Sequence, residues 1–184
     1  MDKVTPSRIA GNRLLFFALA MIGVFILLVP VSLTPGIFVW PEIMLLISCA
    51  LVIRRPEYAP YWLIGFVFLI SDFLLVRPIG LGAFIALLAT EFLRRNRPAF
   101  VEMMFLSEWL GIFLLLLSAG VLRSVILFLT LAERIPLWAF GAQIGLSVVI
   151  YPLVVAFVGL VFKVTKIEET ISHPVRPARA WLDL

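Results

Sequence analysis

The sequence has few of the residues on which catalysis and metal binding usually depend. It holds one cysteine, Cys49, and one histidine, His173, among its 184 residues. A single cysteine forms no disulfide within the chain, and one cysteine with one histidine cannot supply a zinc site. A Ser-His-Asp triad is also excluded within the apolar part of the chain, because the histidine lies near the end of the sequence. Nucleotide-binding and hydrolase motifs are missing as well. We therefore predict no catalytic residue, no metal site and no cofactor, and the chain is not expected to be an enzyme.

Charge is scarce too. Charged residues make up 14% of the chain and hydrophobic residues 63%, and the mean hydropathy is +1.14. Soluble domains are usually ~45–50% apolar and ~25% charged. A soluble protein of this length has too little polar surface to cover so many apolar side chains. The composition predicts an integral membrane protein, and its basic residues are attributed to membrane topology and not to nucleic-acid binding.

Six apolar runs follow one another with short breaks: residues 14–33, 38–53, 61–76, 79–93, 103–131 and 137–162. A membrane-spanning helix needs ~20 residues, so the first, fifth and sixth runs suffice alone and the others must include flanking residues. The runs are apolar on all sides, which argues against a β-barrel. The fifth run is too long for an upright span, so we expect tilt or a break near residues 120–123. The prediction is an all-α domain over residues 1–163, followed by a basic cytoplasmic tail over 164–184.

The basic residues predict the orientation of these helices. If six helices cross the membrane and both termini are cytoplasmic, 12 of the 15 Lys and Arg residues fall on the inner side. The outer loops then hold only Arg77 and Arg134, and Arg123 falls within a span. Such a bias is what the positive-inside rule describes.

Four ionisable residues lie within apolar runs, namely Asp72, Glu91, Glu108 and Arg123. Each costs ~2.5–3.5 kcal/mol at the centre of a membrane, so each needs a partner or a route to the interface. Glu91 and Glu108 are close to polar boundaries and are expected to reach the interface. Arg123 is expected either to reach the interface or to pair with a carboxylate such as Asp72 or Glu108, and the sequence leaves this choice open.

Asp72 is the most demanding of the four, because apolar residues flank it on both sides. Shortly after it comes Arg77-Pro78-Ile79-Gly80-Leu81-Gly82, at the expected start of the next helix. Free backbone N–H groups at a helix start favour an anion, and Pro78 suits a first helical turn. We predict a contact between Asp72, Arg77 and this helix start that is structural rather than catalytic.

Small residues mark possible close helix contacts. The sixth run contains Gly141 and Gly145, a G-x-x-x-G pattern. Such patterns allow helices to approach closely in membranes. We favour packing inside the bundle over a dimer interface.

Several short motifs together resemble the rod shape-determining protein MreD family, in particular its alphaproteobacterial form. They are Pro41-Glu42, Arg54-Arg55-Pro56, Gly65, Ser71-Asp72, the segment from Arg77 to Ala83, and Arg94-Arg95. Some family members carry Gly, Ser or Thr where this chain has Val76-Arg77-Pro78.

The resemblance implies a non-enzymatic subunit of the bacterial inner membrane that takes part in cell elongation and peptidoglycan synthesis. Its implied partner is an MreC-like membrane protein, and indirect partners are an MreB-like filament, the elongation transpeptidase and a RodA-type glycosyltransferase. It also implies a fold similar to the S subunits of energy-coupling-factor vitamin transporters. Two alternatives stay open: a vitamin-binding S subunit, and a proton-linked carrier that uses Asp72 and Glu108.

Overall fold

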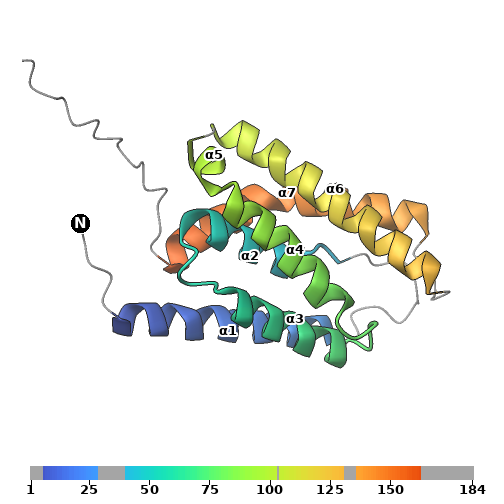
Figure 1. Ribbon diagram of the computed structural model, residues 1–184, viewed down its shortest axis with the longest axis horizontal. Coiled ribbons are helices and arrows are strands. Elements are labelled where there is room, and N and C mark those ends of the chain that lie inside the picture. Colours follow the sequence, from blue (N-terminus) through green and yellow to red (C-terminus); the bar gives the residue numbers. More distant parts are fainter. Residues whose placement is uncertain (1–5, 29–39, 103, 131–135, 163–184) are drawn as a thin grey trace, which may run out of the picture.

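The computed structural model describes residues 6–28, 40–102, 104–130 and 136–162. Within these ranges the chain forms seven helices and no strand (Figure 1). The helices are α1 (Pro6–Leu28), α2 (Ile43–Arg54), α3 (Tyr61–Leu74), α4 (Leu81–Arg95), α5 (Arg97–Glu102), α6 (Phe105–Leu129) and α7 (Leu137–Phe162). The predicted all-α fold is therefore confirmed for the described part of the chain.

Three helices, α1, α6 and α7, are long and apolar enough to cross a membrane. Helices α2 and α3 are apolar but have only 12 and 14 residues. At ~1.5 Å per residue, α2 is about 18 Å long, well short of a hydrocarbon layer of ~30 Å. The chain is thus a membrane protein with helices of two length classes.

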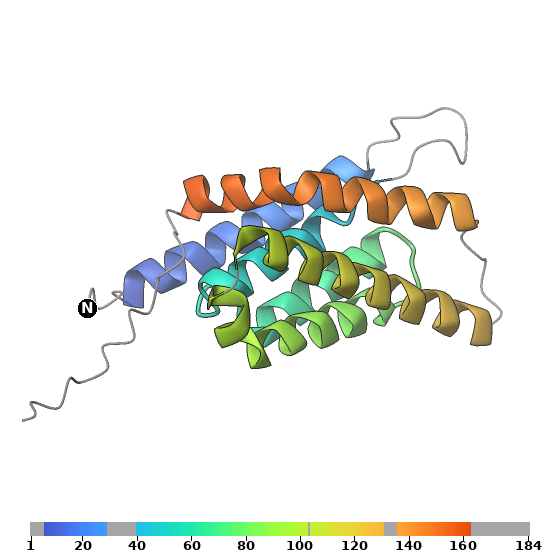
Figure 2. The same cartoon turned by 90° about the horizontal axis from the view of Figure 1, so that it is seen from above.

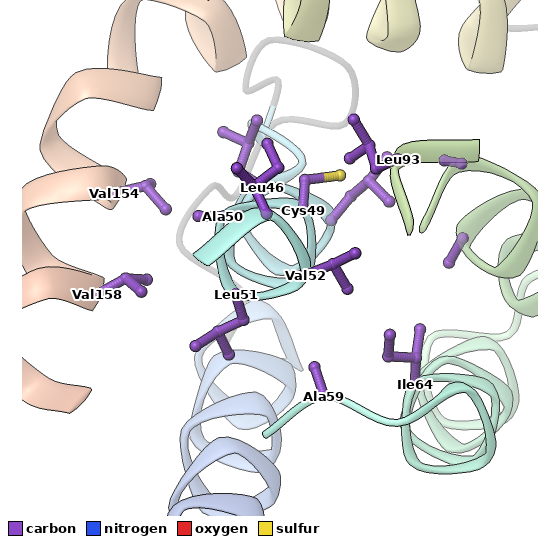
Figure 3. Packing of buried hydrophobic residues seen from close by; sticks show 14 of the residues in the cluster. Leu46, Cys49, Ala50, Leu51, Val52, Ala59, Ile64, Leu93, Val154 and Val158 are labelled. Carbon is purple, nitrogen blue, oxygen red and sulfur yellow. The ribbon is translucent and has the colours of Figure 1, made fainter. Parts of the chain in front are cut away.

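The short helix α2 forms the centre of the bundle. It packs against α1, α4, α5 and α7, and nine of its 12 residues are buried. Figure 3 shows α2 between Val154 and Val158 of α7 on one side and Leu93 of α4 and Ile64 of α3 on the other. Because protein surrounds α2, neighbouring helices rather than lipid determine the length that it needs.

Arginines gather at one end of the bundle, called here the arginine end. Three guanidinium groups donate hydrogen bonds to backbone carbonyls in or beside the α2–α3 connection: Arg13 to Glu57 (3.0 Å), Arg94 to Ala59 (2.8 Å) and Arg97 to Ile53 (3.1 Å). Tyr58 stacks on Phe162, with ring centroids 6.5 Å apart. The start of α1 and the end of α7 therefore lie at the same end.

Some predicted boundaries were wrong. Helix α1 begins at Pro6, eight residues before the first apolar run, because a polar turn starting with proline extends the apolar helix. Helix α6 is continuous through residues 120–123, so of the two expected alternatives, tilt or a break, the break does not occur. Helix α5, which follows α4 after Asn96, was not predicted from the sequence. The predicted tail, residues 164–184, lies outside the described residues.

Candidate functional site

The Asp72 carboxylate binds the start of α4. Its Oδ2 accepts hydrogen bonds from the backbone N–H groups of Gly80 (3.1 Å), Gly82 (2.9 Å) and Ala83 (3.3 Å). These groups have no partner within α4, so a negative charge at this point satisfies them and opposes the positive end of the helix dipole. A Cβ atom at Gly82 would clash with the carboxylate. The predicted contact between Asp72 and the start of α4 is present, so Asp72 caps α4 from the neighbouring helix. The expected part of Arg77 in this contact is not found, because among the described residues its guanidinium forms no hydrogen bond or ion pair with Asp72.

The turn that brings Asp72 and α4 together contains a strained residue. The backbone N–H of Arg77 donates to the carbonyl of Asp72 (3.0 Å), and that of Val76 donates to Phe73 (3.4 Å). This pair of bonds is a Schellman motif, whose left-handed position usually holds glycine. Here Val76 occupies it with φ 52°, and Gly80 has φ 87°. Pro78 precedes α4 by three residues, so its predicted place in the first helical turn was wrong.

A second polar group lies at the entrance to α2, after Trp40-Pro41. Glu42 Oε1 accepts hydrogen bonds from Arg123 Nη1 of α6 (2.9 Å) and Gln143 Nε2 of α7 (2.9 Å). The Glu42 backbone N–H donates to Ser147 Oγ (2.9 Å), which in turn donates to the Gln143 carbonyl (2.7 Å). Arg123 therefore pairs with a carboxylate, as one of the two alternatives had it. The carboxylate is that of Glu42, which was not among the partners expected from the sequence.

Arg77 interacts electrostatically both with Asp72 and with the Glu42–Arg123 pair. Burial lowers the pKa of its guanidinium, the charge of Glu42 raises it, Arg123 lowers it and Asp72 raises it. Glu42, Asp72, Arg77 and Arg123 therefore lie at one end of the bundle, opposite the arginine end. We call these four residues the charged cluster.

Another ion pair is buried deep in the bundle. Glu108 of α6 is fully buried, and its Oε1 accepts from Arg54 Nη1 (3.1 Å) and from the hydroxyl of Tyr151 in α7 (2.6 Å). One prediction was wrong here. Glu108 does not reach the interface, because its first helical turn in α6 faces α2 and α7. The ion pair joins α2 to α6, and the Tyr151 hydroxyl joins α7 to them.

Proline in α7 explains one further contact. Pro152 lacks an N–H group, so the carbonyl of Val148 has no partner one turn later in the helix. The indole N–H of Trp109 in α6 donates to that carbonyl (2.8 Å). The proline within an apolar run was the signal that could have revealed this contact from the sequence.

The glycines of α7 lie elsewhere than expected. A Cβ atom at Gly141 or Gly145 would meet nothing within 4 Å, and both residues are exposed. The preference for packing inside the bundle was wrong, because these glycines face outward. The close approach of α6 to α7 occurs instead at Gly120, where a Cβ would lie 2.5 Å from the ring of Phe140.

The structure brings together only some of the predicted site residues. Pro41, Glu42, Asp72, Arg77, Gly82 and Arg123 all line one cavity. Glu91 lies apart on α4, where it is half-exposed as expected and pairs with Arg95 (3.0 Å) and Arg94 (4.0 Å). Sequence reasoning missed Gln143, Ser147 and Tyr151, polar residues spaced four apart in α7. This spacing places them on one helix face, a usable signal.

These polar groups form hydrogen bonds and ion pairs that join α2, α6 and α7. In the described ranges no three His, Cys, Asp or Glu side chains come close enough to hold a metal ion. Comparison with known proteins finds no matching family model, curated protein or solved structure. The function is therefore inferred from the geometry of the site.

Proposed function

We propose that the chain crosses the membrane six times, with both termini in the cytoplasm. The support is the distribution of charge. Arg13, Arg94 and Arg97 lie at the end of the bundle where α1 starts and α7 ends. By the positive-inside rule, that end faces the cytoplasm. The short helices α2, α3 and α4 cross beside the three long ones.

The proposed function is that of a non-enzymatic scaffold in the cell-elongation machinery of a bacterial inner membrane, as the resemblance to the MreD family implies. The ion pairs Glu42–Arg123 and Glu108–Arg54 support it, because both are used to join helices. An MreC-like membrane protein is the proposed direct partner. Through this partner the chain would associate indirectly with the filament protein, the transpeptidase and the glycosyltransferase of that machinery.

The observation that carries this proposal is the outward face of α7. Along it the small residues Gly141, Gly145 and Ala156 are exposed, and Val149 and Pro152 are exposed between them at spacings of three and four. Helix α7 runs along an edge of the bundle (Figure 2). Lipid offers no hydrophobic driving force for helix association, so faces of small residues that admit close backbone contact favour binding of another helix. We assign this face to the transmembrane helix of the partner.

Copurification tests the proposal. Wild-type protein is expected to copurify with an MreC-like protein from the same membrane in mild detergent. Gly145→Leu fills the α7 face and is expected to reduce the recovered partner at least tenfold. The matched control is Gly11→Leu, which adds the same side chain at an exposed glycine of α1. Equal recovery with wild type and Gly145→Leu contradicts the assignment of the face, and no recovery with wild type contradicts the proposed function.

A further inference from the structure

A cavity of about 450 Å³ extends inward from the charged cluster. Its wall on α1 includes Ile22, Gly23 and Ile26, and its wall on α7 includes Leu153 and Phe157. Apart from its charged end, apolar side chains dominate the lining. The cavity is therefore amphipathic along its length, with charges at one end and hydrocarbon further in.

The cavity is open to the side. Helix α1 packs mainly on α2 and α3, and its closest neighbours do not include α7. The side chains of Ile22, Ile26, Leu153 and Phe157, which line the cavity, are all exposed over two fifths of their surface or more. A Cβ atom at Gly23 would meet nothing within 4 Å. In a bilayer such an opening faces acyl chains, and one chain can enter between α1 and α7.

The volume of the cavity indicates whether it holds a small molecule or a transmembrane helix. Sites for small molecules have volumes of ~300–1,000 Å³. A transmembrane helix of ~20 residues is far larger and belongs on an outer face such as that of α7. The cavity therefore fits a single slender molecule.

Arg77 is the group at the charged end that can bind an anion. Asp72 accepts hydrogen bonds from the N–H groups that open α4, and Glu42 is paired with Arg123. The guanidinium of Arg77 lines the same end and, among the residues that the structure describes, makes no hydrogen bond. Guanidinium groups bind phosphate and carboxylate through two parallel hydrogen bonds. Unused guanidinium donors are thus left at the mouth of an apolar channel.

We propose that this cavity binds an amphiphile with an anionic headgroup, of the phosphate or carboxylate class. Arg77 holds the headgroup, and a single hydrocarbon chain lies between α1 and α7, beside Gly23. Arg77 belongs to the α3–α4 connection, at the end of the bundle, which matches the level of lipid headgroups. This site is separate from the outer face of α7, so it does not depend on the proposed scaffold function.

Native mass spectrometry of the full chain in mild detergent tests the proposal. The probes are dioleoyl phosphatidylglycerol, dioleoyl phosphatidylcholine, which has the same chains and no net charge, and inorganic phosphate. We expect the wild-type protein to bind the phosphatidylglycerol at least tenfold more tightly than the phosphatidylcholine. Inorganic phosphate is expected to bind more weakly still, because it lacks the chain.

Two variants locate the site. Arg77→Gln is expected to abolish the preference for the anionic lipid, whereas Arg95→Gln, an exposed arginine at the opposite end, leaves it unchanged. Gly23→Leu fills the channel and is expected to weaken binding of both lipids at least tenfold. Thermal unfolding of each variant in the same detergent checks that it is folded.

Three results would overturn the proposal. They are equal affinities for the two lipids, equal affinities for phosphatidylglycerol and inorganic phosphate, and unchanged lipid binding by Gly23→Leu. If Gly23→Leu instead releases the copurified partner and keeps its lipid, the channel holds part of the partner and the proposal is wrong. Loss of partner binding by Gly145→Leu alone concerns only the scaffold function.

Discussion

At the scale of single residues, Val76 shows how the α3–α4 turn holds the charged cluster. The residue is 92% exposed, so its side chain gains little from packing. Its left-handed conformation is costly for a β-branched residue. The turn nevertheless directs the backbone N–H of Arg77 onto Asp72 and places α4 against its carboxylate. The contacts made by the flanking residues thus stabilise a conformation that Val76 itself disfavours.

Relief of this strain is the first prediction. Val76→Gly is expected to raise the free energy of unfolding by about 1 kcal/mol, because glycine adopts the left-handed region without steric cost. Equilibrium unfolding in mixed detergent and dodecyl sulfate micelles measures the change. Val76→Ala keeps a Cβ atom and is the control, with an expected gain well below that of glycine. A less stable glycine variant would show that the turn is not strained.

The Asp72 carboxylate gives a second prediction at this scale. Asp72→Asn removes the charge and places an amide near three N–H donors, so it is expected to cost about 2 kcal/mol of unfolding free energy. Glu91→Gln alters a half-exposed carboxylate on the next helix and should cost far less. The same unfolding assay compares them. Equal losses would mean that the cap on α4 contributes nothing beyond a surface charge.

At the scale of the helices, the contact between Trp109 and Val148 compensates for a proline in α7. A backbone carbonyl without a partner is costly in a membrane, where no water is available to satisfy it. Trp109→Phe is therefore expected to cost about 1–2 kcal/mol of unfolding free energy. Pro152→Ala restores an N–H group one turn after Val148 and is expected to remove most of that cost.

A double-mutant cycle isolates this coupling. The four proteins are the wild type, each single variant and the double variant, and their unfolding free energies give an interaction energy of about 1 kcal/mol if the indole replaces the missing helix bond. Additive effects would show that Trp109 contributes only packing. Trp109 is present in only two of the four proteins, so tryptophan fluorescence is not comparable among them. Circular dichroism is therefore the common measurement.

How far the sequence predicted these elements depends on whether the controlling interaction is local. The last helix was placed at residues 137–162, as observed, because a continuous apolar run determines its length. The Asp72 cap was also predictable, since donor and acceptor lie within 11 residues. The partners of Arg123 and Glu108 were not, because Glu42 is 81 positions from Arg123 and Arg54 is 54 from Glu108. Pairing over such separations depends on how helices pack, which hydropathy does not encode.

At the scale of the whole molecule, the two ends of the bundle differ in how they use charge. At the arginine end, guanidinium groups bind backbone carbonyls, and positive charge is left in excess. At the other end, the charged cluster holds two acidic and two basic residues around the mouth of the cavity. An asymmetry of this kind orients a membrane protein, because excess Lys and Arg stay on the cytoplasmic side. The proposed orientation is therefore open to a direct test.

Cysteine labelling in intact cells tests this orientation. Cys49 is fully buried, and a Cys49→Ala chain provides a background without thiols. In that background, Ile79→Cys adds an exposed thiol in the α3–α4 connection, and Asn96→Cys adds one between α4 and α5. A membrane-impermeant maleimide is expected to label position 79 in intact cells and position 96 only after permeabilisation. The two positions flank a single helix, so labelling of both from the same side would mean that α4 does not cross the membrane, and labelling of position 96 alone would invert the whole arrangement.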